Sequence, residues 1–313
     1  MMGKRCNKLK KYPLNQCVLY KCRSMKRLAS IFGTSCTELR YIIRTMTYKS
    51  FSVPKKDSDE LRTISNPNYS LKMAQRRLLS LLQRVQRPVW LISGEKGKCH
   101  IDNARYHLEN SYCLTLDIKA FYDSCIRDYV YRFFTEKMLC APDVANYLTD
   151  LCTFDKGIKT GTPTSQLIAY YAYEDMFWQL QILAKEYGLK FSLYVDDMTF
   201  SKPSFFSYKA FLYRIRGILL RYGHDVKKSK VKFYSKNDAK FVTGVIITSD
   251  HQLVAPYALK AKVRRTRKQL SSKPEDSKKL ANRLLGYISA IKQIEPNLFG
   301  QTQSMAKRIV KSN

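Results

Sequence analysis

The stretch FSLYVDDMTFS, residues 191–201, indicates the fold and carries the most distinctive chemistry of the chain. Its apolar side chains alternate with smaller or polar ones, which is the pattern of a β-strand with one buried face. Asp196 and Asp197 then stand side by side, and the extended pattern resumes after them. The stretch therefore predicts a β-hairpin with two carboxylates at its tip.

Adjacent carboxylates repel each other unless a cation neutralises them, and a divalent ion with oxygen ligands is suited to do so. On their own, two aspartates also fit an ordinary turn. A third carboxylate, Asp117, ends a second predicted buried strand that begins at Leu114. Three carboxylates on two strands predict a site for two Mg²⁺ ions, with Mn²⁺ as a substitute. In such a site one ion activates a hydroxyl and the other holds a triphosphate.

Further segments stand in a fixed order around these strands. They are RTISNP from Arg62, an aromatic residue at Tyr122 five positions after Asp117, GTPTSQ from Gly161, and Gly223 followed by Lys227 and Lys230. Together with YVDD at 194–197, this series resembles the fingers and palm of reverse transcriptases. Each segment alone has low specificity, and the order of all of them is the stronger signal.

Two other motifs resemble those of retron reverse transcriptases. Residues 103–107 read Asn-Ala-Arg-Tyr-His, which is similar to the Asn-Ala-x-x-His motif of these enzymes, and residues 242–244 match their Val-Thr-Gly triplet. His107 has another His and a Cys nearby, but a zinc site would need a second ligand pair with metal spacing. Gly244 alone also fits a strand bulge.

The resemblance implies an α+β fold of the right-hand polymerase type, with fingers, a palm of antiparallel sheet backed by helices, and a helical thumb. The expected divisions are a basic N-terminal helical extension at 1–50, fingers at 51–112 with further elements in 125–165, the palm at 113–255 and a basic helical thumb at 256–313.

The resemblance also implies roles for individual residues. The expected metal ligands are the catalytic Asp117, Asp196 and Asp197 together with the Ile118 carbonyl. Residues expected to contact the incoming nucleotide are Arg62, Lys56, Tyr122, Gly161 and Lys230. The Tyr122 ring is expected to exclude the 2′-hydroxyl of ribonucleotides. Residues expected to bind RNA are Asn103, His107, Val242, Thr243, Gly244, Arg264, Arg265, Arg267 and Lys268. Asn103 and His107 have a second interpretation, as a support for the catalytic strand.

The sequence departs from the family pattern at four positions. Thr160 stands where Gln is usual in the family, and that Gln normally helps to shape the nucleotide pocket. Gln166 stands where Pro is usual. Lys227 replaces a more usual Asn, and Val195 takes a place often held by Ala in retron enzymes. None of these changes removes a metal ligand.

For function, the resemblance implies an RNA-directed DNA polymerase of a bacterial retron. Such an enzyme reverse transcribes its cognate structured non-coding RNA from an internal guanosine 2′-hydroxyl into branched multicopy single-stranded DNA, within a defence system against phage. The implied partners are that RNA as primer and template, its DNA product, dNTPs, a separate effector or toxin protein, and host RNase H for template removal. A cytoplasmic bacterial location without a membrane is expected.

Two alternatives stay open. One is a group II intron-like or diversity-generating reverse transcriptase, which the short C-terminal part and the two retron-like motifs oppose. The other is a non-catalytic polymerase relative that only binds RNA, which the presence of all three carboxylates opposes. Nucleotide incorporation with and without Mg²⁺ distinguishes catalysis from binding.

Composition supports a polyanionic partner. The 313 residues include 56 Lys or Arg against 25 Asp or Glu, a net charge of +31, and such an excess favours nucleic acid. Residues 256–313 hold 14 of the basic and 3 of the acidic residues, in two or three helical patterns suited to gripping a phosphate backbone. No apolar run approaches membrane-spanning length, and the N-terminus lacks the apolar core of a signal peptide. The nine scattered cysteines predict reduced core thiols.

Local patterns predict several other elements. Ser35 and Glu38 form a capping box ahead of a helix, and apolar spacing predicts an amphipathic helix over 71–85. Helices are also expected over 125–151, 165–188 and 205–222, and strands over 241–248 and 253–255.

Overall fold

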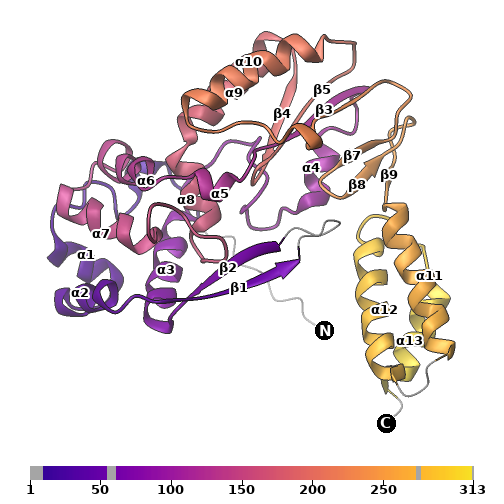
Figure 1. The fold of residues 1–313 in the computed structure, drawn as a ribbon, viewed down its shortest axis with the longest axis horizontal. Coiled ribbons are helices and arrows are strands. Elements are labelled where there is room, and N and C mark those ends of the chain that lie inside the picture. Colours follow the sequence, from indigo (N-terminus) through magenta and orange to yellow (C-terminus); the bar gives the residue numbers. More distant parts are fainter. Residues whose placement is uncertain (1–9, 55–60, 273–275, 312–313) are drawn as a thin grey trace. The chain divides into compact units, whose positions relative to one another are not determined.

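The computed structural model describes residues 10–54, 61–272 and 276–311 (Figure 1). The chain divides into two compact units, each assembled from segments that are distant in sequence. The first unit comprises residues 1–95, 118–183 and 212–227, and the second comprises 96–117, 184–211 and 228–313. Helices α9 (Glu174–Glu186) and α10 (Tyr208–Arg221) each run across a boundary between the units.

The first unit is mainly helical. Its elements are η1 (Leu14–Gln16), α1 (Met25–Phe32), α2 (Cys36–Arg44), α3 (Tyr69–Leu82), α5 (Phe121–Ser124), α6 (Arg127–Arg132), the π-helical turn η2 (Phe133–Lys137), α7 (Pro142–Cys152) and α8 (Ser165–Ala172). Strands β1 (Tyr48–Pro54) and β2 (Leu61–Pro67) form an antiparallel hairpin. Lys56 lies in the connection between these strands, outside the described residues.

Helix starts in this unit follow their capping residues. The Ser35 side chain accepts a hydrogen bond from the Glu38 backbone N–H at 3.0 Å, so the predicted start of α2 is confirmed. Helix α3 begins at Tyr69, before the predicted limit, because the Asn68 side chain caps it. The expected helix over 165–188 is divided at Tyr173 into α8 and α9. The expected helix over 125–151 consists of α6, η2 and α7.

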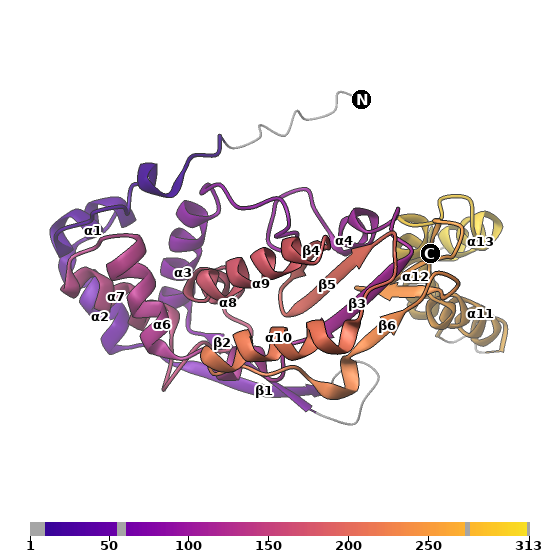
Figure 2. The ribbon, with the colours of Figure 1, turned by 90° about the horizontal axis from the view of Figure 1, so that it is seen from above.

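The second unit contains two antiparallel sheets and a group of C-terminal helices. A four-stranded sheet has the order β4–β5–β3–β6, with strands β4 (Lys190–Tyr194), β5 (Asp197–Lys202), β3 (Tyr112–Asp117) and β6 (Lys232–Tyr234) (Figure 2). A three-stranded sheet has the order β7 (Lys240–Val242), β8 (Val245–Ile247) and β9 (Leu253–Val254). The helical elements are α4 (His100–Tyr106), η3 (Lys228–Lys230), α11 (Tyr257–Ser272), α12 (Ser277–Lys292) and α13 (Gly300–Lys311).

The two faces of the four-stranded sheet differ in chemistry. Pairing places Phe191 beside Phe200 and Leu193 beside Met198, so these buried side chains share one face. Successive strand residues point to opposite faces, so the other face carries Asp197, Thr199 and Ser201 of β5 and the alternate residues of its neighbours. The apolar face forms core, where Phe200 packs on Phe191 and on Phe211 at ring-centroid distances of 4.8 and 5.0 Å.

One predicted strand is wrong. Residues 241–248 do not form a single strand, because a turn at Thr243 and Gly244 separates β7 from β8. Both turn residues have positive φ, 44° and 85°, as a two-residue type I′ hairpin requires. The chain therefore reverses inside the stretch that the apolar pattern predicted as continuous.

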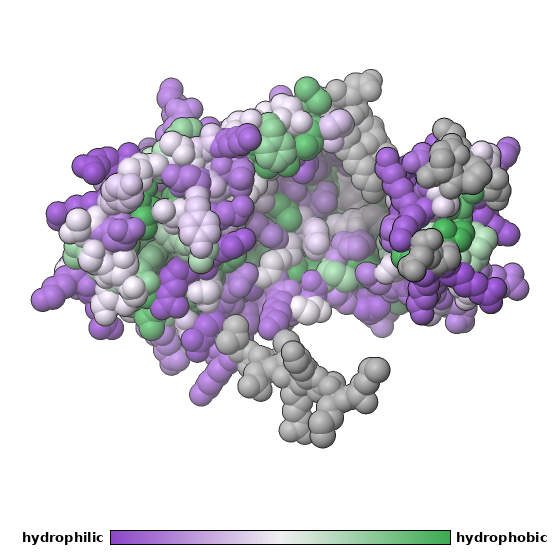
Figure 3. Space-filling view, turned by 90° about the horizontal axis from the view of Figure 1, so that it is seen from below, coloured by the Kyte–Doolittle hydropathy of each residue, from purple (hydrophilic) through white to green (hydrophobic). Residues whose placement is uncertain are grey.

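The C-terminal helices pack around their own apolar core, which includes Val263, Leu284 and Ile288. The Glu295 carboxylate accepts a hydrogen bond from the Ala255 backbone N–H at 2.7 Å and pairs with Lys260 at 2.8 Å. Hydrophilic residues cover much of the part of these helices that faces the viewer at the right of Figure 3. The predicted series of helices after residue 256 is thus confirmed.

The described chain is a mixed α+β protein with antiparallel sheets, as predicted. Its eight described cysteines are all free thiols, and six of them are buried. Within the described residues, every helix is too short or too polar to cross a membrane.

Candidate active site

The acidic hairpin brings two of the three predicted carboxylates into register. Strand β5 lies between β4 and β3, and Asp197 pairs with Tyr194 on one side and with Asp117 on the other. Val195 and Asp196 therefore form the two-residue hairpin turn, and the prediction of acidic residues at its tip is confirmed. Val195 has a φ of 63°, a conformation that is uncommon and strained for a β-branched residue.

Crowding of the carboxylates perturbs the pKa of Asp197. Burial, together with the neighbouring charges of Asp196 and Asp117, raises the pKa of Asp197 to about 7. A hydrogen bond with Asp117 acts in the same direction, while the ammonium group of Lys230 acts against it. The site therefore holds more negative charge than its surroundings stabilise, and a cation would relieve this stress.

The donor set has the chemistry of a magnesium site. Three carboxylates offer hard oxygen ligands, which Mg²⁺ prefers. In the described part of the chain, no three His, Cys, Asp or Glu side chains converge closely enough to enclose a metal ion. Asp117, Asp196 and Asp197 are neighbours in the sheet without forming a closed ligand shell. Ile118 follows Asp117 directly and makes an isolated antiparallel bridge with Val226 in the first unit.

The polar face of the sheet continues from Asp197 to a buried hydrogen-bond network. Ser201 lies four residues along β5 from Asp197, roughly 13 Å at the usual rise of a strand. The His107 ring, 1% exposed, bridges two neighbouring strands: its Nδ1 lies 2.6 Å from the Ser201 hydroxyl and its Nε2 lies 2.7 Å from the Ser192 hydroxyl. His107 thus connects β4 with β5, the two strands of the acidic hairpin.

The partners determine the direction of every bond in this network. The Ser192 hydroxyl donates to Asn103 Oδ1 at 2.6 Å, so it accepts a hydrogen bond from His107 Nε2–H. His107 Nδ1 is then the acceptor, and the Ser201 hydroxyl donates to it. The Asn110 side chain donates to Ser201 at 2.7 Å. Burial lowers the pKa of His107 to about 3, which keeps the ring neutral as this arrangement requires.

The Val-Thr-Gly segment is attached to the same network. Asn103 Nδ2 donates to the Thr243 hydroxyl at 3.3 Å, and that hydroxyl donates to the His100 carbonyl at 2.9 Å. Val242 is fully buried against α4 in a core that includes Ile101 and Ala104. The two retron-like motifs are therefore parts of one packed assembly.

Burial bears on the two interpretations of Asn103 and His107. Both side chains are buried, at 0% and 1% exposure, and both are occupied by protein partners. They offer no surface to an RNA in this conformation, so the geometry favours the interpretation as a support for the acidic hairpin. In the Val-Thr-Gly segment only Thr243 and Gly244 are partly exposed.

Three of the nucleotide-contact candidates, Arg62, Tyr122 and Gly161, lie in the first unit, and Lys230 lies in the second. Gly161 has a φ of 103°, and a Cβ there would lie 2.6 Å from Ile64 Cγ2 of β2. The adjacent Thr160 carbonyl accepts a hydrogen bond from the Ser65 N–H at 2.8 Å. This contact places the Gly161 loop against the strand that carries the exposed Arg62. Tyr122 lies in the short helix α5 and is partly exposed.

The basic residues of α11 are arranged around a buried inner face. Val263, Thr266 and Leu270 point into the helical core. The residues predicted to bind RNA occupy the outer positions and are exposed: Arg264, Arg265, Arg267 and Lys268. Lys230 of η3 is also exposed.

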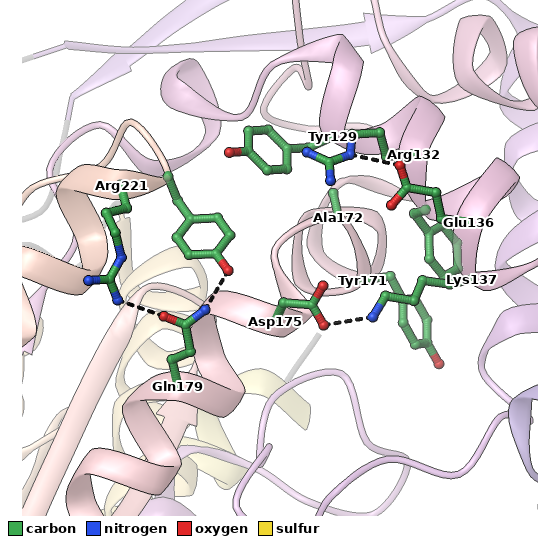
Figure 4. A pocket seen from close by; sticks show the side chains of 11 residues that line it. Tyr129, Arg132, Glu136, Lys137, Tyr171, Ala172, Asp175, Gln179 and Arg221 are labelled. Atoms are coloured by element: carbon green, nitrogen blue, oxygen red, sulfur yellow. Dashed lines mark hydrogen bonds and ion pairs between the residues drawn. The ribbon is translucent and has the colours of Figure 1, made fainter.

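A cavity of about 260 Å³ lies elsewhere in the first unit, beside the π-helical turn (Figure 4). Its charges pair with one another, Lys137 with Asp175 at 2.7 Å and Arg132 with Glu136 at 3.0 Å. Gln179 joins Tyr222 and Arg221 across it. None of the predicted site residues lines this cavity.

The order of the motifs, the acidic hairpin and its neighbouring strand agree with comparisons to known proteins. Residues 53–287 match the family model described as reverse transcriptase (RNA-dependent DNA polymerase). The chain belongs to the reverse transcriptase family.

Curated relatives of this reverse transcriptase family member are retron enzymes. It is 27% identical over 222 residues to the Retron Se72 reverse transcriptase of Salmonella heidelberg, covering 69% of this chain and 59% of that protein. It is 25% identical to the Retron Ec86 reverse transcriptase of Escherichia coli, covering 69% and 68%. It is also 26% identical to the Retron Mx162 reverse transcriptase of Myxococcus xanthus, covering 72% and 53%. The similarity to retron reverse transcriptases that the two motifs predicted is confirmed.

The fold of this family member also resembles a solved telomerase. The structure of telomerase from Candida albicans with a fragment of telomeric RNA matches with a TM-score of 0.52 at 13% identity. The match covers 86% of this chain and 58% of that one, and it concerns the fold alone.

Sequence reasoning missed the residues that complete the buried network. The alternating pattern places Ser192 and Ser201 on a polar strand face, although both are fully buried. Asn110 and its bond to Ser201 were also missed. The signal in the sequence is small: two serines inside strongly apolar strands, with an Asn and a His spaced four apart in a helical segment.

Proposed function

We propose that the chain is an RNA-directed DNA polymerase of a bacterial retron, with a right-hand arrangement of fingers, palm and thumb. The observation that supports this most is the pairing of Asp117 with Asp197 at the tip of the acidic hairpin. The raised pKa of Asp197 adds to it, because a cluster of under-neutralised carboxylates is suited to a dication. The family match and the retron relatives provide the reaction class.

In the proposed site, Asp117, Asp196, Asp197 and the Ile118 carbonyl would hold two Mg²⁺ ions. Bound there, the ions would activate a priming hydroxyl and stabilise the charge on the triphosphate. Lys230 adds a positive charge beside Asp197. Pairing of β5 on both sides holds Asp197 in place, and Asp196 lies beside it in the hairpin turn.

We assign the nucleotide contacts to Arg62, Lys56, Tyr122, Gly161 and Lys230. The Arg62 guanidinium, with Lys56, would bind phosphate oxygens of the incoming dNTP. Tyr122 would exclude a ribose 2′-hydroxyl by steric contact. Gly161 allows the backbone of its loop to lie close to β2, because any side chain there would meet Ile64.

We further propose that the template and primer are one structured RNA, which the basic outer face of α11 holds by its phosphates. The expected product is branched, with DNA joined to an internal guanosine 2′-hydroxyl. A role in defence against phage, with a separate effector protein and host RNase H, follows from the similarity to retron enzymes.

The first test is extension of a primed RNA template by the purified chain with dNTPs and Mg²⁺. Asp196→Asn and Asp197→Asn should abolish extension while RNA affinity changes by less than about twofold, since the RNA contacts lie elsewhere. Normal extension by either variant would refute the site. RNA binding without extension by the native chain would identify it as a binding protein.

The second test concerns the branch. The chain is expressed with the non-coding RNA encoded beside its gene, and the isolated DNA is treated with a 2′,5′-debranching enzyme. Retron synthesis predicts that this treatment separates DNA from RNA. A product with a free, unbranched primer end would favour another class of reverse transcriptase.

A further inference from the structure

A small cavity in the first unit contains a buried arginine whose hydrogen-bonding capacity is only partly used. The cavity has a volume of about 100 Å³ and lies between the segment after α3 and the start of α8. Arg87, Gly94 and Gln166 line it. Gln166 is the residue that replaces the usual Pro of the family pattern, and it has no part in the proposed polymerase site.

Arg87 carries its full charge in a nearly closed environment. Its side chain is 2% exposed, and its Nη2 donates to Glu95 Oε2 at 2.6 Å and to the Gly94 carbonyl at 3.0 Å. Nε and Nη1 are buried and have no hydrogen-bond partner among the described residues. A guanidinium has five N–H donors, so three of them lack a protein acceptor. Buried, unpaired donors on a charged group are strongly unfavourable.

Gly94 lies next to the Arg87 guanidinium and the Gln166 amide in the wall of the cavity. A Cβ built on Gly94 would lie 3.4 Å from Gln166 Nε2 and 3.5 Å from Arg87 Nη1. Gly94 has a φ of 67°, and a methyl group at this position would be in van der Waals contact with both the guanidinium and the amide. Two side chains with N–H donors, from segments far apart in the sequence, thus line one small cavity, and such donors suit an anion.

Charged groups of both signs lie around the cavity. Glu95 pairs with two cations, Arg87 at 2.6 Å and Lys11 at 2.5 Å. A second carboxylate, Glu174, accepts a hydrogen bond from the hydroxyl of Tyr170, which lines the cavity. Lys11 donates as well to the carbonyl of Gln83, which is exposed and lines the cavity. An anion could therefore enter beside Gln83, while the molecule that carries it remains outside.

We propose that the cavity between Arg87, Gly94 and Gln166 is a binding site for an oxyanion, and that it takes a single phosphate group. Its volume accommodates one phosphate and excludes a nucleoside. The phosphate belongs either to the backbone of a bound RNA or to a free nucleotide. Binding links α8 to the segment after α3, where Trp90 already packs on Tyr170 with ring centroids 6.2 Å apart.

The competing explanation is internal pairing. A half-turn of the Gln166 amide would direct its oxygen toward Arg87, and the cavity would then need no anion. A general attraction of phosphate to a chain of net charge +31 is a second alternative. A specific phosphate site differs from both alternatives because substitutions within the cavity abolish the effect of phosphate.

The test measures thermal unfolding of the full chain in 20 mM sodium phosphate and in NaCl of matched ionic strength. Native protein should unfold about 2 °C or more higher in phosphate, through binding to the folded state. Gly94→Ala should lose this increment, because its methyl group fills the position between the donors without changing any charge. Gly33→Ala is the matched control: Gly33 also has positive φ, 73°, but a Cβ there meets nothing within 4 Å. Gly33→Ala should keep the increment.

Gln166→Glu provides the second variant. Its carboxylate should pair with the unused donors of Arg87, so the variant should unfold at higher temperature in NaCl and lose the phosphate increment. Retention of the increment by Gly94→Ala or by Gln166→Glu overturns the proposal and indicates adventitious binding of phosphate. If Gly94→Ala fails to fold, Gln166→Glu still decides the result.

The source of the phosphate is decided by two binding measurements on Gly94→Ala. A backbone source predicts a several-fold loss of affinity for a six-nucleotide single-stranded RNA, with dNTP affinity unchanged. A nucleotide source predicts the reverse. Neither measurement requires catalysis, so a failure of the proposed polymerase function would not be mistaken for a failure of this site.

Discussion

Among single residues, Asp197 shows most clearly that the carboxylates of the acidic site repel one another. Its pKa is raised because it is buried beside Asp196 and Asp117. An unfolded aspartate titrates near 3.9, so between about pH 4 and pH 7 the folded chain binds more protons than the unfolded chain. The contribution of Asp197 to stability is therefore greatest below pH 4 and falls as the pH rises to 7.

We predict that Asp197→Asn stabilises the metal-free chain at pH 8 by about 1–2 kcal/mol after allowance for solvent screening, because it removes this penalty. Mg²⁺ should stabilise the native chain more than the variant. Chemical denaturation at pH 4 and pH 8, with and without Mg²⁺, measures both effects. Asp250→Asn, at an exposed position, serves as the control and should show neither. Equal stability of native and variant chains at pH 8 would contradict the assigned stress.

Gly161 is a residue whose identity depends on a neighbour in another element. Its Cβ position lies 2.6 Å from Ile64 Cγ2, closer than side-chain carbons approach. We predict that Gly161→Ala lowers the free energy of unfolding by about 2–3 kcal/mol, through this overlap and backbone strain. Ile64→Leu removes the Cγ2 methyl group and should restore part of the loss.

The control for Gly161 is Gly188→Ala, which adds a methyl group at a positive φ of 66° where nothing lies within 4 Å. It should cost only the backbone strain, about 1 kcal/mol. Urea denaturation of the two single variants and of the Gly161→Ala, Ile64→Leu pair measures the difference. An equal cost at both glycines would mean that the contact with β2 is unimportant.

Among the elements, α4 and the residue that follows it connect the acidic hairpin to the turn between β7 and β8. His107 contacts β4 and β5 at once, and Asn103 links the same network to the turn between β7 and β8. Each donor in this chain of bonds meets one acceptor, so the arrangement specifies one tautomer of His107. A buried polar network of this kind rigidifies a structure when all its members are satisfied.

We predict that His107 makes stability depend on pH in a defined range. The folded pKa is lowered to about 3 from an unfolded value near 6.5, so the unfolded chain binds the additional proton between these limits. Its contribution is complete above pH 6.5 and decreases by up to about 1.4 kcal/mol for each pH unit below it. His107→Asn should flatten the slope of unfolding free energy against pH between 4 and 6.

The control variant is His251→Asn, because His251 is only partly buried and donates one hydrogen bond, to the Leu108 carbonyl. It should leave the slope unchanged. His224, whose pKa burial lowers to about 4, contributes a similar slope in all of these proteins.

His107→Asn should also reduce kcat more than RNA affinity, since the network supports the hairpin and not the RNA surface. A proportional loss of RNA affinity would instead favour direct recognition.

For the whole molecule, net charge and its distribution point to the partner. The chain has a net charge of +31, and the exposed outer face of α11 carries several of its basic residues. Attraction of this kind is independent of base sequence and weakens as salt displaces the protein from phosphates.

We predict that replacing Arg264 and Arg265 together by Gln reduces the slope of log affinity against log salt by about 1.4–1.8, because each phosphate that is no longer neutralised accounts for about 0.7–0.9. Fluorescence anisotropy with structured RNA from about 50 to 300 mM NaCl measures the slope. Lys185→Gln, an exposed change at the end of α9, is the single-charge control and should change it little. If the control and the α11 variant behave alike per charge, α11 is not a specific contact surface.

Local signals in the amino-acid sequence were sufficient for the acidic hairpin, the catalytic aspartates as candidates, the family and most helices. Those signals are the period of burial along a strand or helix, a capping serine before α2, and two carboxylates that no ordinary core tolerates. The apolar pattern failed at Thr243 and Gly244, because a type I′ turn leaves the periodicity of its flanking strands intact.

Which distant residues meet was settled by the packing of the elements. His107 and Ser192 are 85 positions apart, and Asn103 and Thr243 are 140 apart. No local pattern encodes such a partner, because hydrogen bonds between elements depend on which faces pack together. The same reason holds for Gly161 against Ile64 and for Arg87 beside Gln166. These contacts favour the interpretation of Asn103 and His107 as a support for the acidic hairpin, and they place Arg87 beside Gln166, on which the proposed anion site rests.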